Sequence, residues 1–203
     1  MRRKGFYMTL IHTLLAWDAA FFHFINNSLA NPVFDVLLPW CREKWIWAPL
    51  YLFIAAFSWL RFGNRGWLVL LGLVAVVAIA DGTSSQLIKK NVRRLRPCND
   101  PALTDRVRLR VASCGSGYSF TSSHAANHFG IALFMIGLFG RSRRWLPPVA
   151  LLWASLIALS QVYVGVHYPG DVICGALVGA SIGWGVAWVL RRWVVDNSAK
   201  SNK

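Results

Sequence analysis

Residues 67–87 read WLVLLGLVAVVAIADGTSSQL, and this stretch decides the class of fold. No charged side chain precedes Asp81 in it, and nearly every residue up to that point is aliphatic. A helix of about 20 predominantly apolar residues crosses the hydrocarbon core of a bilayer. The stretch therefore predicts a membrane-spanning helix.

Further apolar runs accompany this stretch in a chain of 203 residues that is 56% hydrophobic and contains 11 tryptophans. A soluble domain of this length carries far less apolar sequence. Residues 8–24 include Asp18, His12 and His23, so they either cross the bilayer or lie along its surface. The other runs expected to span the membrane are residues 45–60, 124–138, 145–166 and 172–190. We therefore predict an all-α polytopic membrane helix bundle with six transmembrane helices.

The domain organisation is simple, because no linker, repeat or change of composition divides the sequence before its polar end. We expect one domain over residues 1–203. Residues 1–44 form its N-terminal part, as an interfacial or first transmembrane segment. The motifs that carry chemistry fall in residues 89–171, and residues 196–203 form a polar tail.

The charges are few and strongly basic, with 22 Lys and Arg against 8 Asp and Glu. Such an excess favours anionic partners, either lipid headgroups and phosphates or nucleic acid. We do not expect nucleic acid, because the basic residues flank apolar runs instead of following one soluble face. The expected partners are the bilayer and a lipid phosphate substrate, and the sequence leaves the oligomeric state open.

Six crossings place most basic residues on one side of the membrane, which the positive-inside rule makes cytoplasmic. The opposite side nevertheless receives a basic cluster between the third and fourth crossings. A solvated loop would explain this cluster without any site, whereas a phosphate-binding site would explain why it lies outside. The basic cluster consists of Lys89, Lys90, Arg93, Arg94, Arg96, Arg106, Arg108 and Arg110.

Residues suited to phosphoryl transfer stand at the extracytoplasmic ends of three predicted helices. That reaction needs cations around the phosphate, a nucleophile, and an acid for the leaving oxygen. His167 and Asp171 are four residues apart around Pro169, which favours a first helical turn. The carboxylate can then bind one imidazole nitrogen and leave the other free to attack phosphorus.

The other requirements have candidates as well. His124 follows two serines at the start of an apolar run, where backbone N–H groups and the Ser122 hydroxyl would bind a phosphate oxygen while His124 acts as general acid. Lys89 and Arg96 are seven residues apart, about two helical turns, so they share one face if the helix continues that far. Both would then hold the same phosphate.

Together these residues resemble the type 2 phosphatidic acid phosphatase family, whose three signatures are Lys-x6-Arg-Pro, Pro-Ser-Gly-His and Ser-Arg-x5-His-x3-Asp. The first is complete at residues 89–97, and the second reads TSSH at residues 121–124. The third occupies residues 160–171 with its spacing intact, but Gln161 stands where the family has arginine. The resemblance covers residues 89–171 and, through the six-helix expectation, nearly the whole chain.

The resemblance implies a mechanism. His167 would form a phosphohistidine intermediate, Asp171 would orient it, and His124 would protonate the departing oxygen and then activate water. Neither a metal nor another cofactor would be required. Gln161 can donate a hydrogen bond but supplies no charge, so either an arginine of the basic cluster compensates or the enzyme is slow or inactive. The phosphate-binding residues by this correspondence are Lys89, Arg96, Ser122, Ser123 and Gln161.

Cys98 and Cys114 bracket the loop between the first two motifs, on the side assigned to the exterior. An oxidising compartment favours a disulfide between them, worth about 3 kcal/mol by chain entropy. His128 lacks a third ligand nearby and is expected to support the site or face the substrate, not to bind a metal. Asp18 within an apolar segment suggests a functional site, but on an interfacial helix it would simply face water, and we prefer the second interpretation.

We therefore expect a lipid phosphatase of the bacterial inner membrane whose active site faces the periplasm or exterior. Undecaprenyl pyrophosphate is the preferred substrate, with phosphatidylglycerophosphate as another candidate, because an amphiphile places its tails between helices and its headgroup at a basic rim. One alternative is a phosphotransferase that passes the phosphoryl group to a second lipid such as lipid A. Another is a weakly active or non-catalytic lipid-phosphate binder, which Gln161 would favour.

Overall fold

The computed structural model describes residues 2–196, and every regular element in that range is a helix. Three α-helices continue directly into a π-helical segment: α1 into η1 (Phe24–Ser28), α4 into η4 (Thr83–Ile88) and α8 into η7 (Arg192–Asp196). The 3-10 turns are η2 (Lys44–Trp47), η3 (Gly63–Arg65), η5 (Pro97–Asn99) and η6 (Thr104–Arg106). The α-helices are α1 (Arg2–His23), α2 (Pro32–Cys41), α3 (Ala48–Phe62), α4 (Gly66–Gly82), α5 (Lys89–Val92), α6 (Ser123–Phe139), α7 (Leu146–Tyr163) and α8 (Pro169–Arg191).

Several of these helices are long and apolar enough to cross a membrane. The stretches that meet both conditions are Tyr7–Ser28, Lys44–Asn99, Leu146–Tyr163 and Pro169–Val194, and Ser123–Phe139 is shorter but equally apolar in character. The stretch Lys44–Asn99 turns back on itself at η3 and so contains both α3 and α4. Each of the six apolar runs thus corresponds to a helix, and the predicted all-α membrane bundle is confirmed.

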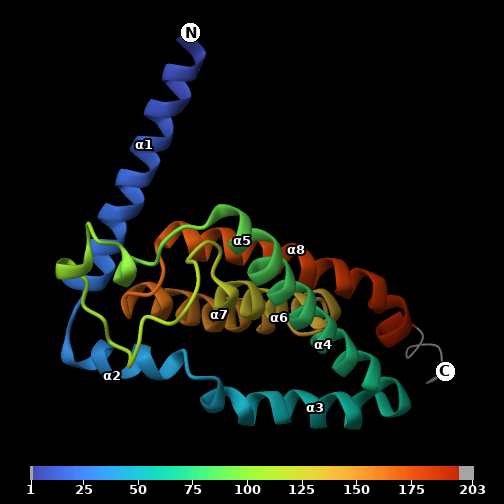
Figure 1. Ribbon diagram of the computed structural model, residues 1–203. Coiled ribbons are helices and arrows are strands. Elements are labelled where there is room, and N and C mark those ends of the chain that lie inside the picture. Colours follow the sequence, from blue (N-terminus) through green and yellow to red (C-terminus); the bar gives the residue numbers. More distant parts are fainter. Residues whose placement is uncertain (1, 197–203) are drawn as a thin grey trace.

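Helix α6 forms the centre of the bundle, with α4, α7 and α8 packed around it (Figure 1). Its Phe134 is fully buried against Val69 and Val76 of α4, which are fully buried too. Gly72 of α4 provides the space for this ring, because a Cβ there would lie 2.5 Å from Phe134. The motif residues at the start of α6 are therefore held by the most buried helix of the fold.

The contact between α6 and α8 depends on small residues. A Cβ at Gly179 would lie 1.9 Å from the carbonyl oxygen of Ala126, and one at Gly183 would lie 2.0 Å from that of Gly130. The backbones of the two helices therefore approach as closely as glycine permits. The glycines of α8 that stand four residues apart therefore serve helix packing.

The two ends of the bundle differ in their connections (Figure 1). The long segment between α5 and α6, drawn in green to yellow, gathers with α2 at the end where α8 begins. The α3–α4 turn and the C-terminal end of α8 lie at the opposite end. Helix α1 leaves the bundle at a steep inclination in this view, and its exposed apolar residues include Leu14 and Trp17.

The end of one predicted run differs from the structure, and one predicted segment is not described by it. The run at residues 145–166 becomes a helix only to Tyr163, because Gly165 adopts a φ of +90° and turns the chain toward α8. The predicted polar tail at residues 196–203 lies outside the described residues except for Asp196.

Candidate active site

Three segments that are distant in sequence meet at the end of the bundle where α8 begins. The turn between α7 and α8 carries His167, the first turn of α6 carries His124, and the segment around α5 carries Lys89 and Arg96. Electrostatic interactions link all four, since Lys89 and His167 both act on His124 and Arg96 acts on both Lys89 and His167. The structure thus brings the predicted motif residues into one site.

His167 is held with one ring nitrogen occupied. Its Nδ1 lies 3.5 Å from Oδ2 of Asp171 and 3.3 Å from Oγ of Ser119, and both residues are fully buried. Its backbone N–H donates to the carbonyl of Gln161 over 3.2 Å, which fixes the turn that carries the ring. Only Nε2 is therefore available to a ligand, and this nitrogen has the free lone pair when Nδ1 carries the proton.

The protonation state of His167 follows from its burial. The residue is 2% exposed, and this burial lowers the pKa of the imidazole below its ordinary value, while Asp171 opposes the shift in pKa. A lowered pKa keeps the imidazole neutral at pH 7. A neutral ring is the form that can act as a nucleophile.

Asp171 belongs to a larger network than the sequence predicts. Its Oδ2 accepts the backbone N–H of Tyr168 at 2.8 Å and the hydroxyl of Ser119, while its Oδ1 pairs with Nη1 of Arg94 at 2.9 Å. Arg94 also lies 3.7 Å above the ring of Tyr168. These contacts fix the carboxylate beside His167 and neutralise its buried charge.

Asp18 takes part in the same network, which contradicts the expectation that it faces water. Its Oδ2 pairs with Nη2 of Arg94 at 2.7 Å, and its Oδ1 accepts the N–H of Gly170 at 2.7 Å. The side chain is only 13% exposed. A carboxylate at the N-terminus of α8 complements the free N–H groups of that helix, which accounts for its position.

His124 and His128 lie one turn apart on α6, with their rings stacked at a centroid distance of 6.4 Å. Nδ1 of His128 lies 2.8 Å from the carbonyl oxygen of His124, its Nε2 lies 3.4 Å from the Tyr51 hydroxyl, and its ring packs edge-on against Trp153. His128 therefore lies deeper in the bundle than His124 and contacts both its backbone and its ring. Among the residues whose side chains the structure describes, no three His, Cys, Asp or Glu are arranged to hold a metal ion.

The serines at the start of α6 have different tasks. Ser122 is the N-cap of α6, and its hydroxyl oxygen accepts the N–H of Ala125 while its O–H remains able to donate. Ser123 instead accepts from Nζ of Lys89 at 3.1 Å and lies 3.0 Å from the hydroxyl of Ser85. Ser123 thereby positions the Lys89 ammonium group at the site.

Arg96 does not share a helix face with Lys89, so that prediction is wrong. Helix α5 ends at Val92, and Arg93 takes a left-handed conformation with a φ of 52°. An extended segment then returns Arg96 to the site, where its guanidinium lies beside Gly115. The loop after α5, and not a continuous helix, therefore brings Arg96 to the same site as Lys89.

A disulfide joins Cys98 and Cys114 in this loop, with their Cα atoms 5.9 Å apart. The disulfide closes a loop whose two ends lie close to Arg96 and Gly115 in the sequence. The guanidinium of Arg96 would lie 3.7 Å from a Cβ placed at Gly115. The disulfide thus holds the backbone against which Arg96 rests.

Gln161, which replaces the arginine of the family signature, is fully buried. Neither its Oε1 nor its Nε2 has a hydrogen-bond partner among the described residues. Such a pair of desolvated polar atoms is costly unless a ligand satisfies it. Gln161 lies next to His167, because its backbone carbonyl accepts the N–H of that residue.

The arginines that were candidates to replace the missing charge are mostly engaged elsewhere. Arg94 binds two carboxylates, and Arg108 and Arg110 both pair with Asp35. A different residue, Arg42 at the end of α2, is half-buried and acts electrostatically on both His124 and Arg96. Burial lowers the pKa of Arg42, but its guanidinium stays charged at neutral pH.

The sequence patterns do not point to Ser119 or Arg42. Ser119 lies in an irregular loop with no periodicity, so nothing local predicts its contact with Asp171. Arg42 follows a short helix broken by Pro39, and its position depends on how α2 packs against α7. Both depend on tertiary contacts of high sequence separation.

Both the sequence and the fold of this chain are similar to those of known proteins. The PAP2 superfamily matches residues 65–196. A lipid A 4'-phosphatase of Bacteroides thetaiotaomicron is 36% identical over 163 residues, which cover 78% of this chain and 70% of that protein. An undecaprenyl-diphosphatase of Sulfolobus acidocaldarius is 29% identical over 171 residues, covering 83% of this chain and 76% of that protein. The crystal structure of a transmembrane PAP2 type phosphatidylglycerolphosphate phosphatase from Bacillus subtilis has a TM-score of 0.60 and 20% identity, covering 92% of this chain and 96% of that one, and shows a shared fold.

Proposed function

The chain belongs to the PAP2 superfamily and is a membrane lipid phosphatase of that family, and from this premise we propose that it hydrolyses a lipid phosphate through a phosphoryl group carried on His167. The observation that carries this proposal is the arrangement of the His167 ring. Nδ1 faces Ser119 and Asp171 at 3.3 and 3.5 Å, and Nε2 is left free. A neutral imidazole fixed through one nitrogen is prepared to attack with the other.

In the first step, Nε2 of His167 forms a bond to phosphorus and the bond from phosphorus to the lipid oxygen breaks. His124 gives its proton to that oxygen, and Asp171 stabilises the positive charge that develops on His167. In the second step, water attacks phosphorus, His124 accepts a proton from it, and the N–P bond breaks. The products are the dephosphorylated lipid and inorganic phosphate.

The phosphate oxygens require donors and positive charge, and we assign these to the predicted set with one addition. Lys89 is positioned through Ser123, and Arg96 through Gly115. Arg42 is the addition, because its charge acts on His124 and Arg96 from the end of α2. It supplies the cation that Gln161 does not. The complete phosphate-binding set is Lys89, Arg96, Arg42, Ser122, Ser123 and Gln161.

We propose lipid A or a similar phosphorylated saccharolipid as the substrate class. The relative from Bacteroides thetaiotaomicron, named a lipid A 4'-phosphatase, supports this choice, since it is 36% identical over 78% of the chain. Undecaprenyl pyrophosphate, preferred from the sequence, becomes the second candidate and is supported by the undecaprenyl-diphosphatase at 29% identity. Both lipids carry phosphate on a headgroup that can reach a basic rim while their tails remain in the bilayer.

The proposed location is a bacterial inner membrane, with the site facing the periplasm. The other end of the bundle carries Arg61 in the last turn of α3, and Arg65, Arg141, Arg143 and Arg144 in the connections between helices. A concentration of arginines in short turns marks the cytoplasmic side. The site at the opposite end then faces outward, where the Cys98–Cys114 disulfide is stable.

Purified protein in detergent tests the proposal through phosphate release from lipid A, undecaprenyl pyrophosphate and phosphatidylglycerophosphate. We expect the highest kcat/KM on lipid A, no release by His167→Ala, and full release by His12→Ala, which removes an exposed histidine of α1. Release that survives His167→Ala would contradict the nucleophile. Higher activity on undecaprenyl pyrophosphate would replace the substrate, and transfer of labelled phosphate to a second lipid on thin-layer plates would replace hydrolysis.

A further inference from the structure

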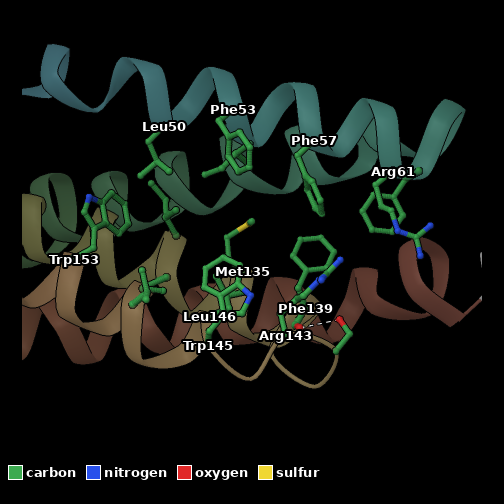
Figure 2. A pocket seen from close by; sticks show the side chains of 17 residues that line it. Leu50, Phe53, Phe57, Arg61, Met135, Phe139, Arg143, Trp145, Leu146 and Trp153 are labelled. Atoms are coloured by element: carbon green, nitrogen blue, oxygen red, sulfur yellow. Dashed lines mark hydrogen bonds between the residues drawn. The ribbon is translucent and has the colours of Figure 1, made fainter.

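A cavity lies away from the proposed active site, between α3 on one side and α6 and α7 on the other (Figure 2). Its volume is about 550 Å³, within the range of about 300–1,000 Å³ that ligand pockets occupy. Aromatic and aliphatic side chains line most of it, among them Phe53, Phe57, Met135 and Phe139. The cavity is therefore suited to a hydrocarbon chain.

One end of the cavity is basic. Arg61 at the end of α3 and Arg143 in the α6–α7 turn both line it, and Figure 2 shows their guanidinium groups at the same end. Both side chains belong to exposed residues, and no ion pair among the described residues involves either of them. The described residues that line the cavity include no Asp or Glu. Two uncompensated arginines at the mouth of an apolar cavity complement an anionic headgroup.

This basic end is distant from the active site. His124 stands at the start of α6 and Phe139, beside Arg143, at its end. Fifteen residues of helix at 1.5 Å each separate the two by about 22 Å. One phosphate cannot occupy both places, so the basic end of the cavity needs a ligand of its own.

The cavity is also accessible from the bilayer. Phe53 on α3 is 64% exposed and Trp145 at the start of α7 is 59% exposed. In a bundle that spans a membrane, exposed aromatic residues on these helices face lipid. A lipid can therefore enter sideways between α3 and α7.

We propose that this cavity binds a phospholipid with an anionic headgroup from the leaflet opposite the active site. The headgroup phosphate lies between Arg61 and Arg143, and an acyl chain extends past Phe57 and Met135 toward Trp153 at the other end of the cavity (Figure 2). Trp153 packs against His128, which supports His124. The bound acyl chain thus ends at Trp153, which is connected to the proposed general acid His124 through His128.

Native mass spectrometry of the full chain in detergent tests this with dioleoylphosphatidylglycerol and dioleoylphosphatidylcholine as probes. Each basic residue near an anionic lipid favours binding severalfold, so two should give a preference for phosphatidylglycerol of about tenfold or more. In the Arg61→Gln/Arg143→Gln variant this preference should disappear, while phosphate release from a detergent-dispersed substrate persists. The second result separates the cavity from the catalytic proposal.

A matched control is Arg65→Gln/Arg144→Gln, which removes the same charge from the same end of the bundle but from residues that do not line the cavity. This variant should keep the preference. Equal loss in both variants would show only general attraction to the basic surface, and equal binding of both lipids by the unaltered protein would show that headgroup charge is not recognised. Displacement of bound phosphatidylglycerol by orthovanadate, a phosphate mimic, would place the lipid in the active site. Each of these three outcomes would overturn the proposal.

Discussion

Replacing Gln161 with methionine should make the protein more stable and less active. The wild-type side chain is fully buried, and both of its polar atoms lack a partner within the described residues. An unsatisfied buried polar group costs about 1–3 kcal/mol. Methionine has nearly the same length and no such group, so the variant should gain about 2 kcal/mol. For a chain of this size each kcal/mol raises the Tm by about 2–4 °C, which gives a rise of about 4–8 °C.

The effect on activity has the opposite sign if the amide serves the substrate. When the phosphoryl group arrives, Nε2 of Gln161 can donate to one of its oxygens, and this hydrogen bond repays part of the desolvation cost. A hydrogen bond to a charged group contributes about 1.5–3 kcal/mol. The Gln161→Met variant should therefore lose about tenfold to a hundredfold in kcat/KM. Gln161→Arg, which restores the family residue, should raise kcat if its guanidinium reaches the same oxygen.

Thermal unfolding by intrinsic tryptophan fluorescence and phosphate release on the same detergent preparation give both quantities. Ser58→Ala is the matched control, because Ser58 is equally buried but its hydroxyl donates to the carbonyl of Ile54 at 2.6 Å, far from the site. It should leave activity unchanged and gain no stability. A lower Tm for Gln161→Met would show that the amide is already satisfied in the free enzyme. A higher Tm with unchanged activity would remove Gln161 from the phosphate-binding set.

Four further outcomes follow from the site. Arg94→Gln breaks a buried ion pair, which costs about 3 kcal/mol, and should lower both the Tm and kcat; an unchanged kcat would mean that the pair serves folding alone. Replacing Cys98 and Cys114 by serine should cost about 3 kcal/mol of stability and raise KM, whereas an unchanged KM would separate the disulfide from substrate binding. Arg42→Gln should lower kcat/KM about tenfold, as expected for one charged contact, with little change in Tm. Because burial lowers the pKa of His167, the acid-side fall of kcat/KM should lie below the ordinary value of 6.5, and a fall that begins above this pH would show that the nucleophile is not the buried neutral imidazole.

The sequence predicts the bundle well because membrane helices follow from local composition. Residues 67–87 correspond to α4 and η4, and residues 124–138 correspond to α6 within one residue at each end. Boundaries fail where the backbone, not hydropathy, ends the helix. The run that begins at Trp145 is apolar to Val166, yet the positive φ of Gly165 ends it earlier.

The site is predicted less completely, and the reason is its dependence on loops. His167 and Asp171 are four residues apart around Pro169, where α8 begins, so the local sequence predicts their contact at the start of this helix. The spacing from Lys89 to Arg96 suggests two turns of helix, but the chain leaves the helix at Arg93. Ser119 contacts Asp171 across 52 residues of sequence, and no periodic pattern encodes such a contact.

The basic cluster now has a more specific explanation than a phosphate site alone. Part of its charge is structural, because Arg94 neutralises the buried Asp171, and Arg108 and Arg110 bind Asp35. These pairs fix the loop and α2 around the site, and an arginine committed to a carboxylate has less charge to offer a substrate. A charge cluster in a sequence therefore overstates the number of cations available to a ligand, because it also counts cations that are already paired with a carboxylate. No salt bridge among the described residues involves Lys89, Arg96 or Arg42, the three cations that we assign to the phosphate, and Lys89 donates to the Ser123 hydroxyl.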